Sequence, residues 1–227
     1  MMVKKYKSKI ISVKNQIPGI YTIELKSLNG IFKYFPGQFL HLALDTNYDG
    51  SGQWPESRCF SMQSNPEEEN IRITYAVKGR FTKLMEQYLI TGSEVWLKLP
   101  YGNLFTQPHN KGNTVFIAGG TGITPFLSLF NHKSFSEYIN PHIYLGFRST
   151  EYNTYQTELD HSCNSLQFVK YFYDDINGQP NIHSIYKENG TTCDYFISGP
   201  PVMIEAFKQV LIAKGVPESQ ILTDDWE

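Results

Sequence analysis

The first half of the chain consists of short segments in which apolar and polar residues tend to alternate, separated by turn residues. Tyr21–Leu25 alternates well and Lys7–Val13 less regularly. Four further segments of this kind follow, at Phe39–Leu44, Arg58–Met62, Ile71–Val77 and Glu94–Leu99. Evenly spaced short strands with intervening turns predict an antiparallel barrel or sandwich. One segment differs, because the apolar residues of Phe81–Leu89 have helical spacing.

In the second half of the chain, apolar strands alternate with helices. The expected strands are Val115–Ala118, His142–Phe147, Gln167–Tyr173, Asp194–Ser198 and Gln220–Leu222. The expected helices are Pro125–His132, Tyr155–His161, Asn181–Lys187 and Pro200–Lys214. The apolar stripe that we expect the last helix to bury comprises Val202, Met203, Ala206, Phe207, Val210 and Leu211. Alternating strands and helices predict a doubly wound parallel sheet, which binds ligands beyond the carboxyl ends of its strands.

A glycine-rich turn joins the first of these strands to the first of these helices. The apolar run Val115–Ala118 ends at Gly119–Gly122, and Pro125 suits the first turn of a helix. A strand, a glycine turn and a helix N-terminus together favour a phosphate, because backbone N–H groups point at the ligand. The turn is neither a P-loop nor a G-x-G-x-x-G fingerprint, since Pro125 stands where the third glycine belongs. Such turns also occur for packing alone, so the ligand must be inferred from the rest of the chain.

Composition and charge narrow the class of protein. The 227 residues are 41% hydrophobic and 15% aromatic, which suffices for two small packed domains or one large one. A net charge of −2 and a pI near 6.3 argue against nucleic acid or an anionic membrane as the main partner. We expect no membrane span and no signal peptide, because the long apolar runs that both require are missing from the sequence. Three widely spaced cysteines, Cys59, Cys163 and Cys193, predict neither a disulfide framework nor a metal site, and favour a reduced, cytoplasmic protein.

Two stretches of the first half carry candidate chemistry. Arg58–Ser61 places a cation, an aromatic ring and a hydroxyl on one short strand. Gly79–Thr82 places a glycine before a helix N-terminus, which is again compatible with a phosphate. Taken singly, each has a plain structural explanation, since a strand arginine is usually solvated and a glycine before a helix is usually a turn.

Six motifs in order along the chain resemble those of the ferredoxin–NADP reductase family. Arg58–Ser61 resembles its R-x-[YF]-S flavin motif, and Gly79–Thr82 its G-x-x-[ST] diphosphate motif. The others are Pro36–Phe39, Pro100–Phe105, Gly120–Pro125 and Ser198–Met203, of which the last two resemble its nicotinamide-domain signatures. The resemblance covers nearly the whole chain. It implies an antiparallel Greek-key FAD-binding β-barrel over residues 1–109 and a doubly wound NAD(P)-binding domain over residues 112–227.

The resemblance implies roles for residues of the barrel. Arg58 would pair with the flavin diphosphate, because a guanidinium gives forked, charge-assisted hydrogen bonds. Phe60, where family members often carry Tyr, would lie against the isoalloxazine ring. Ser61 would hydrogen-bond near the flavin N5 edge as a catalytic residue, and the loop Asp45–Ser57 would meet the adenine. The residues that would complete the FAD-binding set are Gly79, Phe81 and Thr82.

In the nucleotide domain, the implied site lies at the carboxyl ends of the strands. Family members often carry Cys where this chain has Ser198, so a hydroxyl replaces a sulfur at this predicted catalytic position. A capping role for Ser198 is the alternative. The implied NAD(P)-binding residues are Gly120, Thr121, Gly122, Arg148, Gly199 and Pro200.

The choice between NADH and NADPH depends on charge near the second and third strands of this domain. Arg148 follows the second strand, but the third ends in Tyr173–Asp175, whose carboxylates would repel a 2′-phosphate. NADH is therefore favoured over NADPH.

The C-terminal residues offer two further candidates. In parts of the family a terminal aromatic covers the flavin where nicotinamide must enter, and Trp226 has the matching position. Asp224, two residues earlier, would assist proton and hydride chemistry as a catalytic residue. An unconstrained tail is the alternative, because terminal residues are often frayed.

These observations predict a flavoprotein oxidoreductase that transfers a hydride from NADH or NADPH to bound FAD and passes electrons singly to a separate acceptor. The acceptor classes are ferredoxin, flavodoxin, an oxygenase component or a small molecule, since three cysteines are too few for a four-thiolate cluster of the chain's own. Two alternatives stay open. One is a reductase subunit that is inactive without partners, and the other is a non-catalytic nucleotide-binding or scaffold subunit of a larger redox complex. The intact flavin motifs argue against the second.

Overall fold

A computed structural model of the chain describes residues 1–163 and 168–224, which form two compact units, Met1–Asn103 and Leu104–Glu227. The division precedes the boundary that the sequence suggested at residues 110–113. The physical reason is that Leu104 belongs to the core of the second unit. The ring of Phe105 also packs on Phe116 and Phe196 there, with centroid distances of 6.2 and 5.0 Å.

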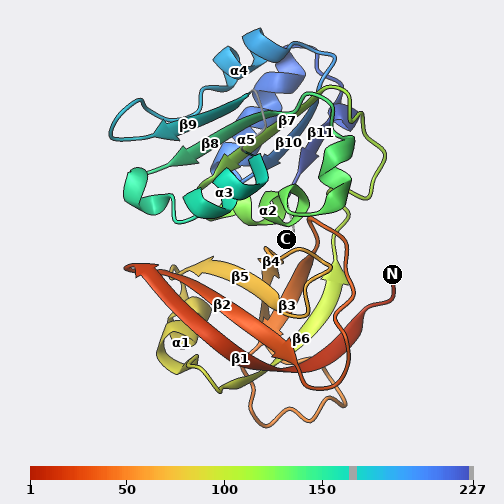
Figure 1. Cartoon of the computed structure of the whole chain (residues 1–227), viewed down its shortest axis with the longest axis vertical. Coiled ribbons are helices and arrows are strands. Elements are labelled where there is room, and N and C mark those ends of the chain that lie inside the picture. The colour runs from red at the N-terminus through yellow and green to blue at the C-terminus, as the bar shows by residue number, and fades with distance from the viewer. Residues whose placement is uncertain (164–167, 225–227) are drawn as a thin grey trace. The chain divides into compact units, whose positions relative to one another are not determined.

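The first unit is built on a six-stranded antiparallel sheet with the strand order β4-β3-β6-β1-β2-β5 (Figure 1). Its strands are β1 (Lys4–Ile17), β2 (Ile20–Ser27), β3 (Phe39–Ala43), β4 (Ser57–Ser61), β5 (Ile71–Ala76) and β6 (Glu94–Tyr101). The edge strands β4 and β5 approach each other just beyond Ser61, where the Gln63 amide donates to the Arg72 carbonyl at 2.8 Å. The sheet therefore nearly closes, which confirms the predicted barrel and excludes the sandwich.

Buried and solvent-facing side chains alternate along β1, so one face of this strand contributes to the core of the barrel. Tyr6, Ser8 and Ile10 are buried, while the lysines between them keep their amines toward solvent. The helix α1 (Arg80–Tyr88) adds Phe81 and Met85 to the same apolar cluster, as its periodicity predicts.

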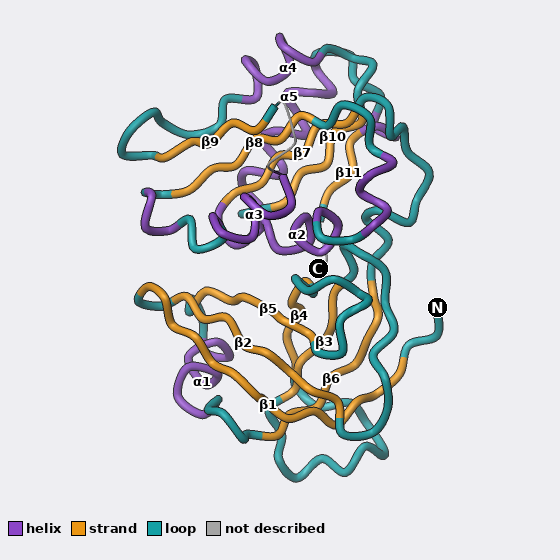
Figure 2. Tube along the Cα trace, in the orientation of Figure 1, coloured by secondary structure: helices purple, strands orange, loops and turns teal. Residues whose placement is uncertain are grey.

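The second unit is a five-stranded parallel sheet with the strand order β11-β10-β7-β8-β9. Its strands are β7 (Thr114–Gly119), β8 (His142–Phe147), β9 (Val169–Tyr173), β10 (Asp194–Ser198) and β11 (Ile221–Thr223). Its α-helices are α2 (Thr124–Phe130), α3 (Gln156–Cys163), α4 (Ile182–Asn189) and α5 (Pro201–Ala213). Helices α2 and α3 cover one face of the sheet, and α4 and α5 cover the other (Figure 2). This arrangement confirms the doubly wound prediction.

Successive residues of β7 supply both cores of this unit. Phe116 and Ala118 point into the cluster that contains α2 and α3 residues, whereas Val115 and Ile117 point into the cluster that contains α4 and α5 residues. A strand buried on both faces reads as a continuous apolar run, which is why the sequence identified it.

Several details differ from the sequence prediction. The side of α5 that packs on the sheet comprises Ile204 and Leu211, with the partly buried Met203, Phe207 and Val210 beside them. The predicted stripe is therefore confirmed at Met203, Phe207, Val210 and Leu211. It is wrong at Val202, which is 83% exposed, and at Ala206, and it missed Ile204. Short 3-10 helices that were not predicted follow some strands and helices, namely η1 (Gly120–Ile123), η2 (Lys133–Glu137), η3 (Thr150–Tyr152) and η4 (Glu218–Gln220). Across residues 1–163 and 168–224, no helix is both long and apolar enough to cross a membrane.

Candidate functional site

Two arginines of the first unit share one carboxylate. Arg58, on β4, lies with its guanidinium over the Phe81 ring, 5.3 Å from the ring centroid. Its Nη2 is 3.4 Å from Glu56 Oε1. Arg80, the first residue of α1, places its Nη2 2.6 Å from the other oxygen of the same carboxylate. Glu56 thus bridges a strand arginine and a helix arginine, both of which are exposed.

The turn that starts α1 is held by the Thr82 hydroxyl. Its Oγ1 lies 2.9 Å from the Lys78 amide and 3.1 Å from the Gly79 amide, and accepts from both. Gly79 has an extended backbone and is exposed. The sequence assigned Thr82 to diphosphate binding, and the structure shows its hydroxyl in a capping role that shapes the turn.

An open pocket of about 330 Å³ is lined in part by Glu56, which pairs with both arginines, and by Phe81, over whose ring Arg58 lies. Its lining comes from the loop before β4 and from α1: Leu44, Asp45, Pro55, Glu56, Phe81 and Leu84. Apolar walls with a few polar groups suit a planar heterocycle, and two adjacent guanidinium groups suit a diphosphate. The residues present therefore fit the adenosine diphosphate part of FAD.

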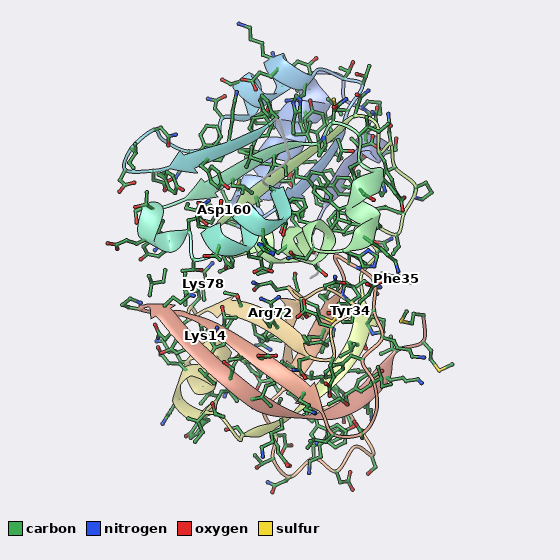
Figure 3. The ribbon with its side chains drawn as sticks, in the orientation of Figure 1. Lys14, Tyr34, Phe35, Arg72, Lys78 and Asp160 are labelled. Atoms are coloured by element: carbon green, nitrogen blue, oxygen red, sulfur yellow. The ribbon has the colours of Figure 1, made fainter. Side chains whose placement is uncertain are left out.

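Around the end of β4 and the facing strand β5, several polar side chains are buried, which is unusual for a barrel interior. Its members are Gln38, Ser61, Gln63, Ser64 and Thr74, none more than 8% exposed. The Thr74 hydroxyl donates to Gln63 Oε1 at 2.7 Å. Tyr34 and Arg72, both labelled in Figure 3, also contact this set, through the side chain of Ser64. Ser61 is thus placed in a polar environment at the seam of the barrel.

The other two residues of the R-x-[YF]-S motif lie on opposite faces of β4. Phe60 is 8% exposed and contacts Tyr75 in the barrel core, at a centroid distance of 6.0 Å. Cys59 lies beside His41, with Sγ 3.6 Å from Nε2. Burial raises the pKa of the Cys59 thiol, although the charge of Arg58 opposes the shift. The thiol is therefore mainly protonated at neutral pH, in keeping with a packing role.

In the second unit, the turns after β7 and β10 approach each other backbone to backbone. A Cβ added to Gly122 would lie 2.5 Å from the Gly199 Cα and N atoms. Gly199 has a φ of +155°, and a Cβ there would lie 2.6 Å from Met203 Cε. Gly122 is therefore required by contact with rigid backbone, whereas Gly199 is favoured by its positive φ, because the Met203 methyl group could move aside. Gly120, with a φ of +56°, begins η1, and Gly120, Thr121, Gly122 and Pro200 are all at least partly accessible to solvent.

The structure brings together two residues that the sequence named for catalysis. Ser198, the last residue of β10, is 1% exposed and donates its hydroxyl to Asp224 Oδ2 at 3.1 Å. The Asp224 amide donates to the Ile197 carbonyl at 3.0 Å. The Asp224 carboxylate is thus held at the carboxyl end of β10, beside Gly199.

The remaining predicted residues differ in their placement. Arg148 follows β8, is exposed, and lies 5.6 Å from the ring centroid of Tyr152. Asp174 follows β9 and accepts from Gln179 Nε2 at 3.2 Å. Trp226 lies outside the described residues.

Sequence reasoning missed Glu56 and gave Arg80 no role of its own. Arg80 lies inside the G-x-x-[ST] motif, so its charge beside the helix N-terminus was a usable signal. Glu56 lies in a loop outside every motif, and its role depends on a side chain that reaches two arginines. Within the described part of the chain, no group of three or more His, Cys, Asp or Glu side chains is arranged to hold a metal ion.

Comparison with known proteins agrees with this geometry. Residues 116–209 match the family model of the oxidoreductase NAD-binding domain. The reductase component of propane 2-monooxygenase from Rhodococcus jostii is 29% identical over 213 residues, which cover 85% of this chain and 55% of that protein. The chain therefore spans about half the length of this relative. A ferredoxin NADP+ reductase from Neisseria gonorrhoeae, solved with bound FAD and NADP, shares the fold with a TM-score of 0.78 and 19% identity, covering 93% of this chain and 92% of that one.

A nearly closed antiparallel barrel followed by a doubly wound unit is the fold that this chain shares with the Neisseria gonorrhoeae reductase. The second unit contains the match to the oxidoreductase NAD-binding domain, at residues 116–209.

Proposed function

We propose that the chain is a reductase that takes a hydride from NADH onto bound FAD and delivers electrons singly to a separate acceptor. The observation that supports this proposal is that each of the two units carries a group of residues suited to one of the two nucleotides. The first has Arg58 and Arg80 beside an apolar pocket. The second has the paired glycine turns with the Ser198–Asp224 contact.

Each of these two groups of residues has a distinct task in this proposal. FAD, when bound, accepts two electrons as a hydride and can release them one at a time. Arg58 and Arg80 bind its diphosphate, and the pocket lined by Phe81 holds the adenine. Ser61 donates or accepts a hydrogen bond from its buried position at the seam of the barrel. On the second unit, Gly199 admits the nicotinamide ring and Asp224 positions or moves a proton beside it.

The acceptor is inferred from the relatives. The Rhodococcus jostii protein is named as the reductase component of a monooxygenase, and a Comamonas protein 32% identical over 133 residues is named as the reductase component of terephthalate 1,2-dioxygenase. The Comamonas match covers 56% of this chain and 37% of that protein. We infer that this chain likewise supplies electrons to an oxygenase component in the cytoplasm. Three free cysteines suit that reducing compartment.

The preference for NADH rests on charge at the carboxyl ends of β8 and β9, where the proposed site would hold the ribose. Asp174 and Asp175 follow β9 and would repel a 2′-phosphate, whereas Arg148 is the basic residue that follows β8. Its guanidinium lies over the Tyr152 ring, 5.6 Å from the centroid. NADH is therefore the proposed donor.

An absorbance spectrum of the purified protein tests the core of the proposal. Supplied with FAD, the protein should show a flavin spectrum that bleaches under anaerobic NADH, and should bleach more slowly with NADPH at equal concentration. Arg58→Ala should lower FAD occupancy, because the diphosphate loses its forked partner.

A protein that binds no flavin, or whose flavin responds to neither nicotinamide, would contradict the proposal. It would favour the scaffold alternative instead. Equal or faster bleaching by NADPH would overturn the preference for NADH alone.

A further inference from the structure

Glu56 occupies the position between the two arginines where an anion would be bound. Its two oxygens are 3.4 Å from Arg58 Nη2 and 2.6 Å from Arg80 Nη2. It also lines the adjoining pocket. A carboxylate and a phosphate compete for the same guanidinium donors, because both present oxygens in a forked geometry.

The two ion pairs of Glu56 are weak enough for another anion to replace its carboxylate. The side chains of Glu56, Arg58 and Arg80 are 49%, 54% and 74% exposed, so solvent screens both ion pairs. The Glu56 side chain starts two residues before Arg58 in a loop, whereas the arginines are carried by β4 and α1. The carboxylate can therefore leave without disturbing the strand or the helix that carries its partners.

We propose that Glu56 is an internal competitor for the diphosphate subsite, which must release Arg58 and Arg80 before FAD binds and which thereby weakens FAD binding. This inference rests on the proposed function, because it assigns Arg58 and Arg80 to the FAD diphosphate. Glu56 pairs with both guanidinium groups, and its negative charge would repel an incoming diphosphate.

Titration of FAD onto the flavin-free protein tests the proposal through binding, without any activity measurement. Glu56→Gln keeps the size of the side chain and removes its charge. The dissociation constant for FAD should fall about threefold to tenfold, which matches the loss of two exposed ion pairs that compete with the ligand. Riboflavin, which has no phosphate, should bind the variant and the wild type equally.

Two further variants separate competition from a general charge effect. Glu69 is another exposed glutamate of the same unit, paired with Lys26 at 2.9 Å, so Glu69→Gln should leave FAD affinity unchanged within about a factor of two. In an Arg80→Gln background, Glu56→Gln should have a smaller effect than in the wild type. The reason is that one of the two competed donors is already gone.

The outcomes separate this inference from the proposed function. If the wild type binds FAD but Glu56→Gln binds it equally or more weakly, Glu56 does not compete and the inference is overturned while the proposed function stands. An equal gain for riboflavin or for Glu69→Gln would also overturn it. A wild type that binds no FAD removes the proposed function and this inference together.

Discussion

Asp224, which we propose as a catalytic residue, is held by two hydrogen bonds. The Ser198 hydroxyl donates to the Asp224 carboxylate at 3.1 Å, and the Asp224 amide is bound to the Ile197 carbonyl. Ser198 is 1% exposed and its hydroxyl is engaged by Asp224, so in the proposed reaction it would position the carboxylate. The Asp224 carboxylate would then be the group that meets the substrate.

Replacing this carboxylate should slow hydride transfer. For Asp224→Asn we expect the limiting rate of flavin reduction by NADH to fall about tenfold or more, since a positioned acid or base typically contributes at least this much. The affinity for NADH should change little. Anaerobic stopped-flow reduction at several NADH concentrations separates the two quantities.

Asp160→Asn is the matched control for this measurement, because Asp160 lies on α3 and is bound to Gln156 at 2.6 Å. In the Asp160→Asn variant, NADH should reduce the flavin at the wild-type rate. An unchanged limiting rate in Asp224→Asn would show that Asp224 only completes the end of the sheet.

At the scale of the elements, the turns after β7 and β10 form one structure. The strands are neighbours in register, with Ala118 beside Ser198, so the residues that follow them meet directly. The missing side chain of Gly122 allows this contact, since its place is taken by the backbone of Gly199.

Adding a single methyl group at Gly122 should push these two turns apart. We expect Gly122→Ala to lower the affinity for NADH about tenfold and to lower the melting temperature, because overpacking against a rigid backbone typically costs about 1–3 kcal/mol. Gly112→Ala serves as the control, since its Cβ would meet only the Asn110 side chain, at 3.1 Å. Wild-type NADH affinity in Gly122→Ala would show that the turns can move apart freely.

Much of this architecture could be predicted from the sequence, for physical reasons that differ between elements. The bounds of His142–Phe147 and Asp194–Ser198 were predicted as observed, because strands buried on both faces are uninterrupted apolar runs. The stripe of α5 was mispredicted only at its edge, where Val202 and Ala206 were named instead of Ile204, since in an apolar helix neighbouring stripes fit the same periodicity and tertiary packing selects one. Glu56 could not be predicted, because ion pairing across a loop, a strand and a helix leaves no pattern in sequence.

At the scale of the whole molecule, the net charge of −2 conceals an uneven distribution. Residues 1–103 carry 13 Lys and Arg against 9 Asp and Glu, whereas residues 104–227 carry 7 against 13. The flavin-binding unit is therefore basic, which suits a dianionic diphosphate, and the nucleotide-binding unit is acidic, which agrees with a donor that has no 2′-phosphate.

Stability should fall in alkaline solution because of a buried thiol. Burial raises the pKa of Cys163 from its ordinary value of 9.0 to about 12, so the folded chain favours the thiol and the unfolded chain ionises first. This stabilisation is complete below pH 9 and is lost as the pH rises toward 12. The loss is about 1.4 kcal/mol per pH unit within that window.

Urea unfolding at several pH values between 8 and 11 measures this slope. Cys163→Ala should start less stable, because it leaves a cavity in the core, but should decline less steeply. Buried tyrosines such as Tyr138, whose pKa is also raised by burial, account for the decline that remains. Parallel curves for the variant and the wild type would contradict the assignment to Cys163.

The contact between Gly122 and Gly199 also has a consequence for the order of events during synthesis. The residues of the arginine pair and its pocket all lie between Leu44 and Leu84, so the ribosome has made them before the second unit begins. The residues proposed to bind the nicotinamide instead need β10 and the start of α5, which are made more than 100 residues after Leu84. A nascent chain therefore acquires the residues proposed to bind FAD well before those proposed to bind the electron donor.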